Sequence, residues 1–252
     1  MNHPGRNLAD EIRWIGQNGF DFIDLTLEPP EARADRIDPD MVRDLTGEFG
    51  LSIIGHTSPF LPFASPYEAV RRECVEVIVQ SLDVFAELGV SVVNMHVSNS
   101  KGGESWEENI EHNRWSFERA TAAATERGIR LMLEHFGKTY AEIGNLRKIL
   151  DHVPGLGFHL DVGHANLWQP RNWTAELLEA FGDRLVHVHV SDNHGGDRDE
   201  HLPLGAGNID WPWALGCIRK SGYDATITAE VFSIDRSFLL AARDQLREWW
   251  AA

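Results

Sequence analysis

Two kinds of hydrophobic pattern alternate along the chain. Apolar residues spaced three or four positions apart predict helices near residues 7–18, 40–49, 67–88, 107–127, 140–152, 174–182, 211–220 and 235–251. Between them, short runs with apolar residues at every second position predict strands near 21–28, 51–57, 91–98, 130–136, 156–162, 184–191 and 225–232. Regular alternation of this kind is typical of βα units, which build a parallel sheet.

The length of the chain narrows the fold class to an α/β barrel. A chain of 252 residues has about the usual length of a (β/α)8 TIM barrel. No linker or low-complexity tract divides the sequence, so we expect a single domain over residues 1–252. The pattern gives seven strands, however, and the chain opens with the helical segment LADEIRWIGQNG. We therefore expect the first barrel strand to be missing or to be formed irregularly by MNHPGR.

Strand after strand has a His, Asp or Glu at its last inward-pointing position. Alternate side chains of a strand point to opposite faces, so the apolar face of 184–191 carries Val186, Val188 and Val190, and the other face carries His187 and His189. Carboxylates and imidazoles collected at one end of parallel strands are the ligands that a divalent metal ion requires. These residues predict a metalloenzyme; in chain order they are Glu28, His56, His96, Glu134, Asp161, His189 and Glu230.

Two loops in the second half add further candidate ligands. Asp161 and His164 are three residues apart across a strand end, so both can turn toward one point. The loop after strand 184–191 contains Asp199 and His201, and this D-x-H spacing can present both side chains to the same site. His159 and His187 lie deeper on the inward faces, where we expect hydrogen-bonded core or supporting residues.

Charge and cysteine content restrict the partners and the compartment. The net charge of −16 opposes binding to nucleic acid or to anionic membranes, which attract clustered Lys and Arg. Cys74 and Cys217 both lie in predicted helices, which fits a reducing compartment better than a disulfide framework. No apolar run approaches the ~20 residues of a membrane span. We expect a cytoplasmic protein with no nucleic-acid or membrane partner, and the sequence leaves homo-oligomer formation open.

Five motifs together resemble the xylose isomerase-like TIM barrel superfamily, which contains sugar isomerases, sugar epimerases and endonuclease IV. The motifs are LMLEHF, HLDVGHANL, VHVHVSDNHG, DEHLPLGAGNIDW and ITAEVF, and the resemblance extends over roughly residues 7 to 240. For the sugar-converting branch it implies one metal ion held by Glu134, Asp161, His189 and Glu230, with His164 contacting the substrate. The endonuclease branch uses nine ligands for three zinc ions, and its additional matches here are His56, His96, His164, Asp199 and His201. The expected cofactor is therefore one to three divalent ions, Zn²⁺ or Mn²⁺.

The acidic charge favours the sugar-converting branch. We expect a metal-dependent isomerase or epimerase that acts on a sugar, or on a sugar-like ketone or polyol, through an enediolate. The resemblance implies that Glu134 and Glu230 form the acid/base pair. The alternative is a multinuclear metal phosphodiesterase resembling endonuclease IV, and a barrel that binds sugar or metal without turnover is a third reading.

Three more residues are candidate substrate contacts in addition to His164. Glu28 ends a strand, Trp106 lies beside a strand-end loop, and Arg198 lies in the loop that carries Asp199. Their structural alternatives are a salt bridge for Glu28, helix packing for Trp106 and simple solvent exposure for Arg198. Trp115, Trp168 and Trp211 present the same choice as Trp106, between stacking on a sugar and packing.

Overall fold

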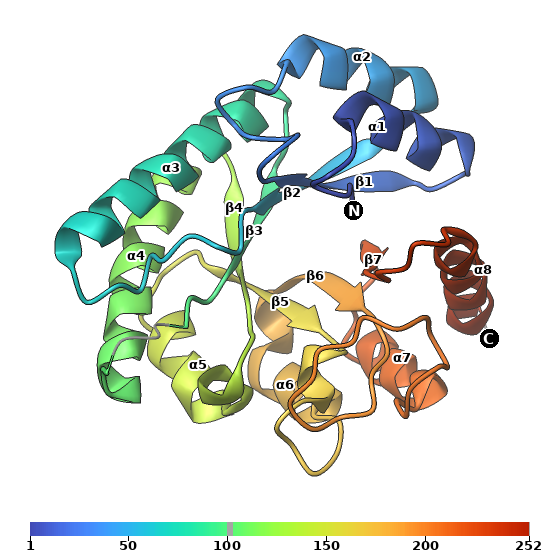
Figure 1. Ribbon diagram of the computed structural model, residues 1–252. Coiled ribbons are helices and arrows are strands. Elements are labelled where there is room, and N and C mark those ends of the chain that lie inside the picture. The colour runs from blue at the N-terminus through green and yellow to red at the C-terminus, as the bar shows by residue number, and fades with distance from the viewer. Residues whose placement is uncertain (100–102, 252) are drawn as a thin grey trace. The chain divides into compact units, whose positions relative to one another are not determined.

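The computed structural model describes residues 1–99 and 103–251, which form two compact units. Unit one comprises Met1–Leu133 and Arg147–Leu156, and unit two comprises Glu134–Leu146 and Gly157–Ala252. Both units alternate helices and strands, as the sequence pattern predicts (Figure 1).

Unit one contains parallel strands covered by paired helices. Strand β1 pairs with β2, and β2 pairs with β3, all in parallel. Helix α1 packs with α2, and α3 packs with α4, on the outside of these strands (Figure 1). The elements are α1 (Leu8–Gln17), β1 (Phe22–Leu27), α2 (Pro39–Phe49), β2 (Ser52–Thr57), α3 (Glu68–Glu87), β3 (Val92–His96), α4 (Trp106–Glu126) and β4 (Arg130–Glu134), whose last residue belongs to unit two.

The first strand is replaced by an irregular segment, as predicted. No strand precedes α1 in the described chain, but Asn2 lies along β1. The Asn2 backbone N–H donates to the Asp24 carbonyl at 3.3 Å. Its side chain also accepts from the Thr26 N–H at 2.7 Å and donates to the Thr26 carbonyl at 3.2 Å. The amide of Asn2 therefore supplies the pairing that a neighbouring strand would supply.

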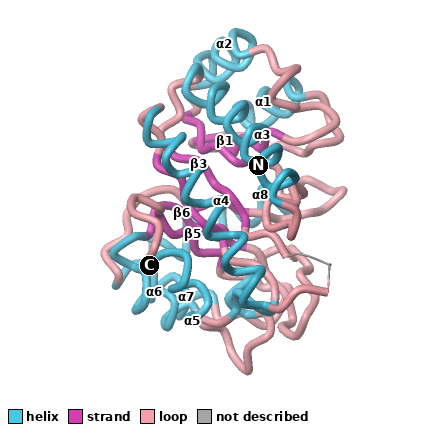
Figure 2. Tube along the Cα trace, turned by 90° about the vertical axis from the view of Figure 1, so that its left-hand side faces the viewer, coloured by secondary structure: helices cyan, strands magenta, loops and turns pink. Residues whose placement is uncertain are grey.

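Unit two contains three parallel strands in the order β5-β6-β7. Helices α6 and α7 contact each other and lie beside β5 and β6 (Figure 2). The elements are η1 (Lys138–Ala141), α5 (Ile143–Leu150), which continues into unit one, β5 (Gly157–Asp161), η2 (His164–Asn166), α6 (Thr174–Phe181), η3 (Gly182–Arg184), β6 (Leu185–Val190), α7 (Trp211–Lys220), β7 (Ile227–Ala229) and α8 (Ser237–Ala251).

The apolar faces of β5 and β6 fix the direction of their polar faces. Phe158 of β5 is fully buried, and its ring lies 5.2 Å from that of Phe181 on α6. Val188 and Val190 of β6 are fully buried as well. Because side chains alternate along a strand, burying these residues turns the histidines and the acids of both strands to the opposite face.

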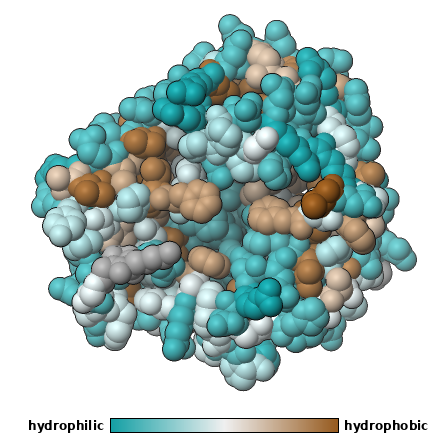
Figure 3. All heavy atoms as spheres, in the orientation of Figure 1, coloured by the Kyte–Doolittle hydropathy of each residue, from teal (hydrophilic) through white to brown (hydrophobic). Residues whose placement is uncertain are grey.

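The segment after β7 carries apolar side chains at the surface. Phe232, Ile234 and Phe238 are 60%, 97% and 47% exposed, and brown spheres mark apolar surface beside α8 in Figure 3.

Among the helices of residues 1–99 and 103–251, none combines the length and the apolar composition that a membrane span requires.

Candidate metal centre

Four buried residues converge at the carboxyl ends of consecutive strands. Glu134 ends β4, Asp161 ends β5, His189 is the penultimate residue of β6, and Glu230 directly follows β7. One donor atom from each lies within 4.8 Å of the donor atoms of the other three. His189 Nδ1 is 3.1 Å from Glu230 Oε2 and 3.7 Å from Glu134 Oε1. The structure thus brings together the four-ligand set that the sequence resemblance implies.

The donor chemistry of this set fits a divalent cation. Its members supply carboxylate oxygens and an imidazole nitrogen, which suit Zn²⁺ or Mn²⁺. Asp161 Oδ1 accepts a hydrogen bond from the His164 backbone N–H at 2.8 Å. The other oxygen, Asp161 Oδ2, is buried and receives no hydrogen bond from the described residues. A buried carboxylate oxygen without a donor is costly, and a metal ion would compensate for that cost.

Burial and neighbouring charges give the acids of this cluster different pKa values. Burial raises the pKa of Glu134 to about 8, although the imidazoles of His189 and His164 partly oppose the shift. Burial also raises the pKa of Asp161. Burial opposes ionisation of Glu230 too, but the imidazoles of His189, His201 and His164 together outweigh it and lower the pKa of Glu230 to about 2. Burial therefore disfavours the ionised forms of Glu134 and Asp161, and a nearby cation would favour them.

Three further residues extend the cluster. Asp199 Oδ2 lies 3.1 Å from His164 Nε2 and 2.9 Å from His201 Nε2. His164 Nδ1 is in turn 3.5 Å from Glu134 Oε1, and His201 Nδ1 is 3.7 Å from Glu230 Oε2. Both histidines therefore face Asp199 on one side and the four-ligand set on the other. The three side chains have the chemistry either to hold another ion or to bind hydroxyl groups.

The charged forms of Asp199, His164 and His201 stabilise one another, as their pKa values indicate. Burial alone would lower the pKa of His164, but Asp161, Asp199 and Glu134 raise it to about 10. Burial likewise opposes protonation of His201, yet Asp199 and Glu230 raise its pKa to about 9. Burial would raise the pKa of Asp199, but its hydrogen bonds to His164 and His201 hold it well below the usual range. Asp199 is thus an ionised link between two imidazoles.

The loop between β6 and α7 is folded around the carboxylate of Asp192. Asp192 Oδ2 accepts from the Gly205 N–H at 2.8 Å and from the Trp211 indole N–H at 2.9 Å. Asp192 Oδ1 accepts from the backbone N–H groups of Asn193 at 2.9 Å and Ile209 at 3.3 Å. These four donors place the intervening segment, which carries Asp199 and His201. Trp211 is buried by this contact, so it takes the packing alternative.

A glycine is required where this loop passes over its anchor. A Cβ at Gly207 would lie 2.2 Å from the Asn193 carbonyl oxygen and 2.3 Å from Asp192 Oδ1. Asp192 is not among the site residues predicted from the sequence. The G-x-G motif of DEHLPLGAGNIDW was the available signal, because such a motif marks a close backbone approach.

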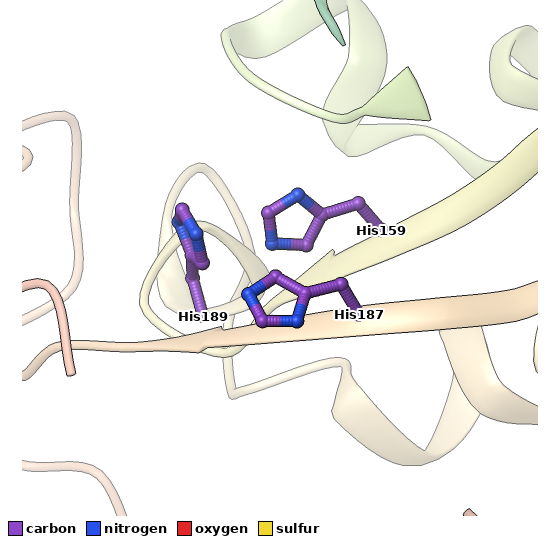
Figure 4. Close-up of side chains that lie close together, drawn as sticks. All are labelled: His159, His187 and His189. Carbon is purple, nitrogen blue, oxygen red and sulfur yellow. The ribbon is translucent and has the colours of Figure 1, made fainter. Parts of the chain in front are cut away.

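Two histidines lie one layer below the cluster. His187 and His189 project from the same side of β6, and His159 of β5 turns toward them (Figure 4). The nitrogens of His187 lie 2.8 Å from Thr226 Oγ1 and 2.9 Å from Thr228 Oγ1. His159 Nδ1 lies 3.4 Å from Glu134 Oε2, and its ring centroid lies 4.1 Å from that of His189. Both therefore lie beneath the candidate ligands, where the sequence predicts hydrogen-bonded core or supporting residues.

The remaining candidates from the sequence lie in unit one or in the loop after β6. In unit one, the His56 and His96 rings stack at 5.1 Å, and Glu28 is buried, which raises its pKa. Trp106 is 48% exposed, with the Lys148 ammonium 4.2 Å from its ring centroid. In unit two, Arg198 is exposed in the loop after β6. A role for His56 and His96 as ligands, and for Glu28, Trp106 and Arg198 as substrate contacts, stays a prediction.

Comparison with known proteins identifies relatives of this fold. A family model described as "Xylose isomerase-like TIM barrel" matches residues 12–251, which confirms the predicted barrel fold. The L-ribulose 3-epimerase of Methylomonas sp. (strain DH-1) is 28% identical over 235 residues, covering 88% of this chain and 77% of the relative.

Two solved structures are similar to this chain over most of its length. A D-tagatose 3-epimerase-like protein has a TM-score of 0.86 and 25% identity, covering 98% of this chain and 94% of the other. The D-allulose 3-epimerase from Methylomonas sp., in complex with D-allulose, has a TM-score of 0.76 and 26% identity, covering 91% and 81%.

Proposed function

Because this chain belongs to the xylose isomerase-like TIM barrel family, we propose that it is a sugar epimerase or isomerase that depends on a divalent metal ion. Its substrate would be a ketose, as the names of the L-ribulose and D-allulose 3-epimerases suggest. The observation that carries the proposal is the convergence of Glu134, Asp161, His189 and Glu230 within unit two. Four buried ligands of this kind have no evident structural purpose without an ion.

The four converging residues would hold Zn²⁺ or Mn²⁺, which when bound polarises a carbonyl and an adjacent hydroxyl group and so acidifies the carbon-bound proton between them. The side chains around the ion then determine where the proton goes. Glu134 ends β4 and Glu230 directly follows β7, and His189 Nδ1 lies within 3.7 Å of a carboxylate oxygen of each. Each glutamate has a second oxygen beyond the one that an ion would need.

We assign the proton transfers to this pair of glutamates. One carboxylate takes the proton from the carbon next to the ketose carbonyl, and the electron pair of the broken C–H bond forms the enediolate. The other glutamate returns a proton to the opposite face of the same carbon, which inverts its configuration. The reverse reaction uses the same two groups with exchanged roles, so no additional reactant is needed.

The neighbouring charged group would orient the substrate. His164 and His201 offer N–H donors, and Asp199 between them offers carboxylate acceptors. Hydroxyl groups both donate and accept hydrogen bonds, so an alternating arrangement of donors and acceptors suits a polyol chain. Because four hydrogen bonds to Asp192 fix the loop, this arrangement is preorganised.

Isotope exchange tests the proposal directly. The protein is stripped with chelator, reloaded with Mn²⁺ or Zn²⁺, and incubated in D₂O with D-allulose, D-tagatose and L-ribulose. We expect epimerisation of at least one ketose with one deuterium incorporated at the inverted carbon, and no turnover by the stripped protein. Absence of deuterium incorporation into every ketose after metal reloading would contradict the proposed function.

A further inference from the structure

Trp168 has a backbone conformation that bulky residues rarely adopt. Its φ is +58°, in the left-handed region. The Trp168 N–H donates to the Gly196 carbonyl at 2.7 Å, and Leu167 forms a parallel bridge with Gly196. The loop after β5 is thereby tied to the loop after β6, and the tie fixes the backbone at Trp168. Strained positions of this kind persist where the surrounding structure enforces them, and they concentrate at ligand sites.

The indole of Trp168 begins a row of aromatic rings that ends at the candidate metal centre. The Phe136 ring centroid lies 5.8 Å from that of Trp168, with the planes at 76°, and 4.9 Å from that of His164. His164 Nδ1 lies 3.5 Å from Glu134 Oε1. Trp168 and Phe136 are both only half-buried, unlike the fully buried core ring of Phe158. An accessible aromatic surface therefore continues outward from the four ligands.

We propose that Trp168 and Phe136 form a subsite that binds the carbons of the ketose beyond the reacting pair. The inference rests on the proposed function and names the part of the substrate that sets its specificity. A sugar presents C–H bonds between its hydroxyl groups, and these pack against the electron-rich faces of aromatic rings. Polar groups at the cluster would bind the reacting carbons of the ketose, and the two rings would pack against its remaining carbons. Small-molecule sites commonly combine a few orienting polar groups with an apolar and aromatic lining.

The subsite favours an uncharged end of the substrate. Residues 162–173 carry a single Arg or Lys, Arg171, whose guanidinium is paired with Glu176 at 2.5 Å. Within residues 162–173, a phosphate on the far end of the sugar would thus meet the indole of Trp168 and no unpaired Arg or Lys. The expected substrate class is a free ketose of five or six carbons.

The test compares substrates that do and do not reach the rings. In the metal-loaded protein, Trp168→Ala should raise KM for D-allulose about tenfold and change kcat less than about twofold, the size expected for one lost aromatic contact. The same variant should leave KM for the four-carbon ketose erythrulose within about twofold of wild type, because only one carbon of that chain lies beyond the reacting pair. Trp168→Phe should keep most of the D-allulose affinity. Phe136→Leu should repeat the length-dependent loss in case Trp168→Ala folds poorly.

Trp213→Ala is the matched control, since Trp213 is also a partly exposed tryptophan of unit two but lies on α7. Equal effects of Trp168→Ala on long and short ketoses, or none on either, would overturn the subsite. A higher kcat/KM for a ketose phosphate than for the free ketose would also overturn it.

Calorimetric titration of D-allulose into the metal-loaded protein separates the two proposals. If wild type binds D-allulose but turns over no ketose, the proposed function fails, and about tenfold weaker binding by Trp168→Ala still supports the subsite. If wild type turns over ketoses while Trp168→Ala binds D-allulose as wild type does, the subsite alone fails.

Discussion

Glu134 and Glu230 show how neighbours give one residue type two behaviours. Both are buried, and burial raises the pKa of Glu134 to about 8. Glu230 has His189 Nδ1 at 3.1 Å, and this imidazole, together with His201 and His164, more than offsets burial and lowers the pKa of Glu230 to about 2. Two carboxyl groups whose environments push their pKa values apart are a common arrangement for an acid and a base. The pair therefore deserves the first mutational test.

Replacing either glutamate with glutamine should abolish most of the turnover. Glu134→Gln and Glu230→Gln keep the side-chain volume, but an amide neither accepts nor returns a proton, and general acid/base groups contribute roughly 10²–10⁴ in rate. We expect kcat to fall at least about a hundredfold in each variant, measured with the metal-loaded protein. Circular dichroism should show an unchanged fold, and Glu179→Gln on the exposed face of α6 should retain full activity. Wild-type kcat in either site variant would remove the proposed pair.

Deprotonation of His201 should lower the stability of the metal-free protein at alkaline pH. Despite burial, Asp199 and Glu230 raise its pKa to about 9, above the ordinary value near 6.5. A raised pKa means that the folded state binds the proton more tightly than the unfolded state. The resulting stabilisation is complete below about pH 6.5 and is lost as the pH rises through about 9. We expect the Tm of chelator-treated protein to fall between pH 7 and pH 10.

His201→Gln supplies the control for this pH dependence, because glutamine keeps a polar side chain that does not titrate. The fall in Tm over the same pH interval should be smaller in His201→Gln than in wild type. An identical fall in both proteins would show that His201 does not contribute.

At the scale of elements, the loop between β6 and α7 depends on one carboxylate. Asp192→Asn would turn an amide N–H₂ toward the Gly205 N–H and the Trp211 indole N–H, which now donate to Oδ2. Leaving such donors unsatisfied in a buried place costs about 1–3 kcal/mol each. We expect about 3 kcal/mol lower stability and a reduced kcat/KM, because Asp199 and His201 lose their fixed positions.

Urea unfolding and steady-state kinetics check the role of Asp192. Asp197→Asn removes an exposed carboxylate of the same loop and should change neither quantity. A variant Asp192→Asn with wild-type stability would show that the loop is held by other contacts.

Periodicity predicted most elements to within a few residues, and its errors have local causes. The helix expected at 140–152 is divided into η1 and α5, because residue 142 is extended between them. The strand expected at 225–232 shortens to Ile227–Ala229, since the chain after it changes partners. The Glu230 N–H donates to Val190 of β6, but the Phe232 N–H donates to the His201 carbonyl in the loop. Hydrophobic alternation alone does not reveal such a change of partner.

In the candidate site, the convergence of side chains could be predicted where it follows from the strand pattern. Glu134, Asp161 and His189 lie at strand ends, so their convergence follows from parallel strands. Asp192 and Phe136 were missed because their roles depend on contacts with distant residues, such as the Trp211 indole and the Trp168 ring. The irregular first strand was foreseen from the missing repeat, whereas the side-chain pairing of Asn2 was not.

At the scale of the whole molecule, the net charge distinguishes between the two enzyme functions considered for this site, a sugar epimerase and a phosphodiesterase. His164, Asp199 and His201 lie together beside the four-ligand cluster, which also suits a multinuclear phosphodiesterase. The chain has 39 Asp and Glu against 23 Lys and Arg, a net charge of −16.

The single domain over residues 1–252 and the cytoplasmic location remain predictions from the sequence.

We predict that the protein neither binds nor incises duplex DNA containing an abasic site at physiological salt. Nonspecific affinity for DNA comes mainly from counterions released when Lys and Arg neutralise phosphates, so a strongly acidic protein should be repelled. The loops after His56 and His96, TSPFLPFASP and SNSKGGESWEE, contain one Lys and no Arg. Gel-shift and nicking assays with protein loaded with Zn²⁺ or Mn²⁺ provide the measurement. Metal-dependent incision that disappears in Glu134→Gln would promote the phosphodiesterase reading over the epimerase, because contamination with another nuclease would not respond to that substitution.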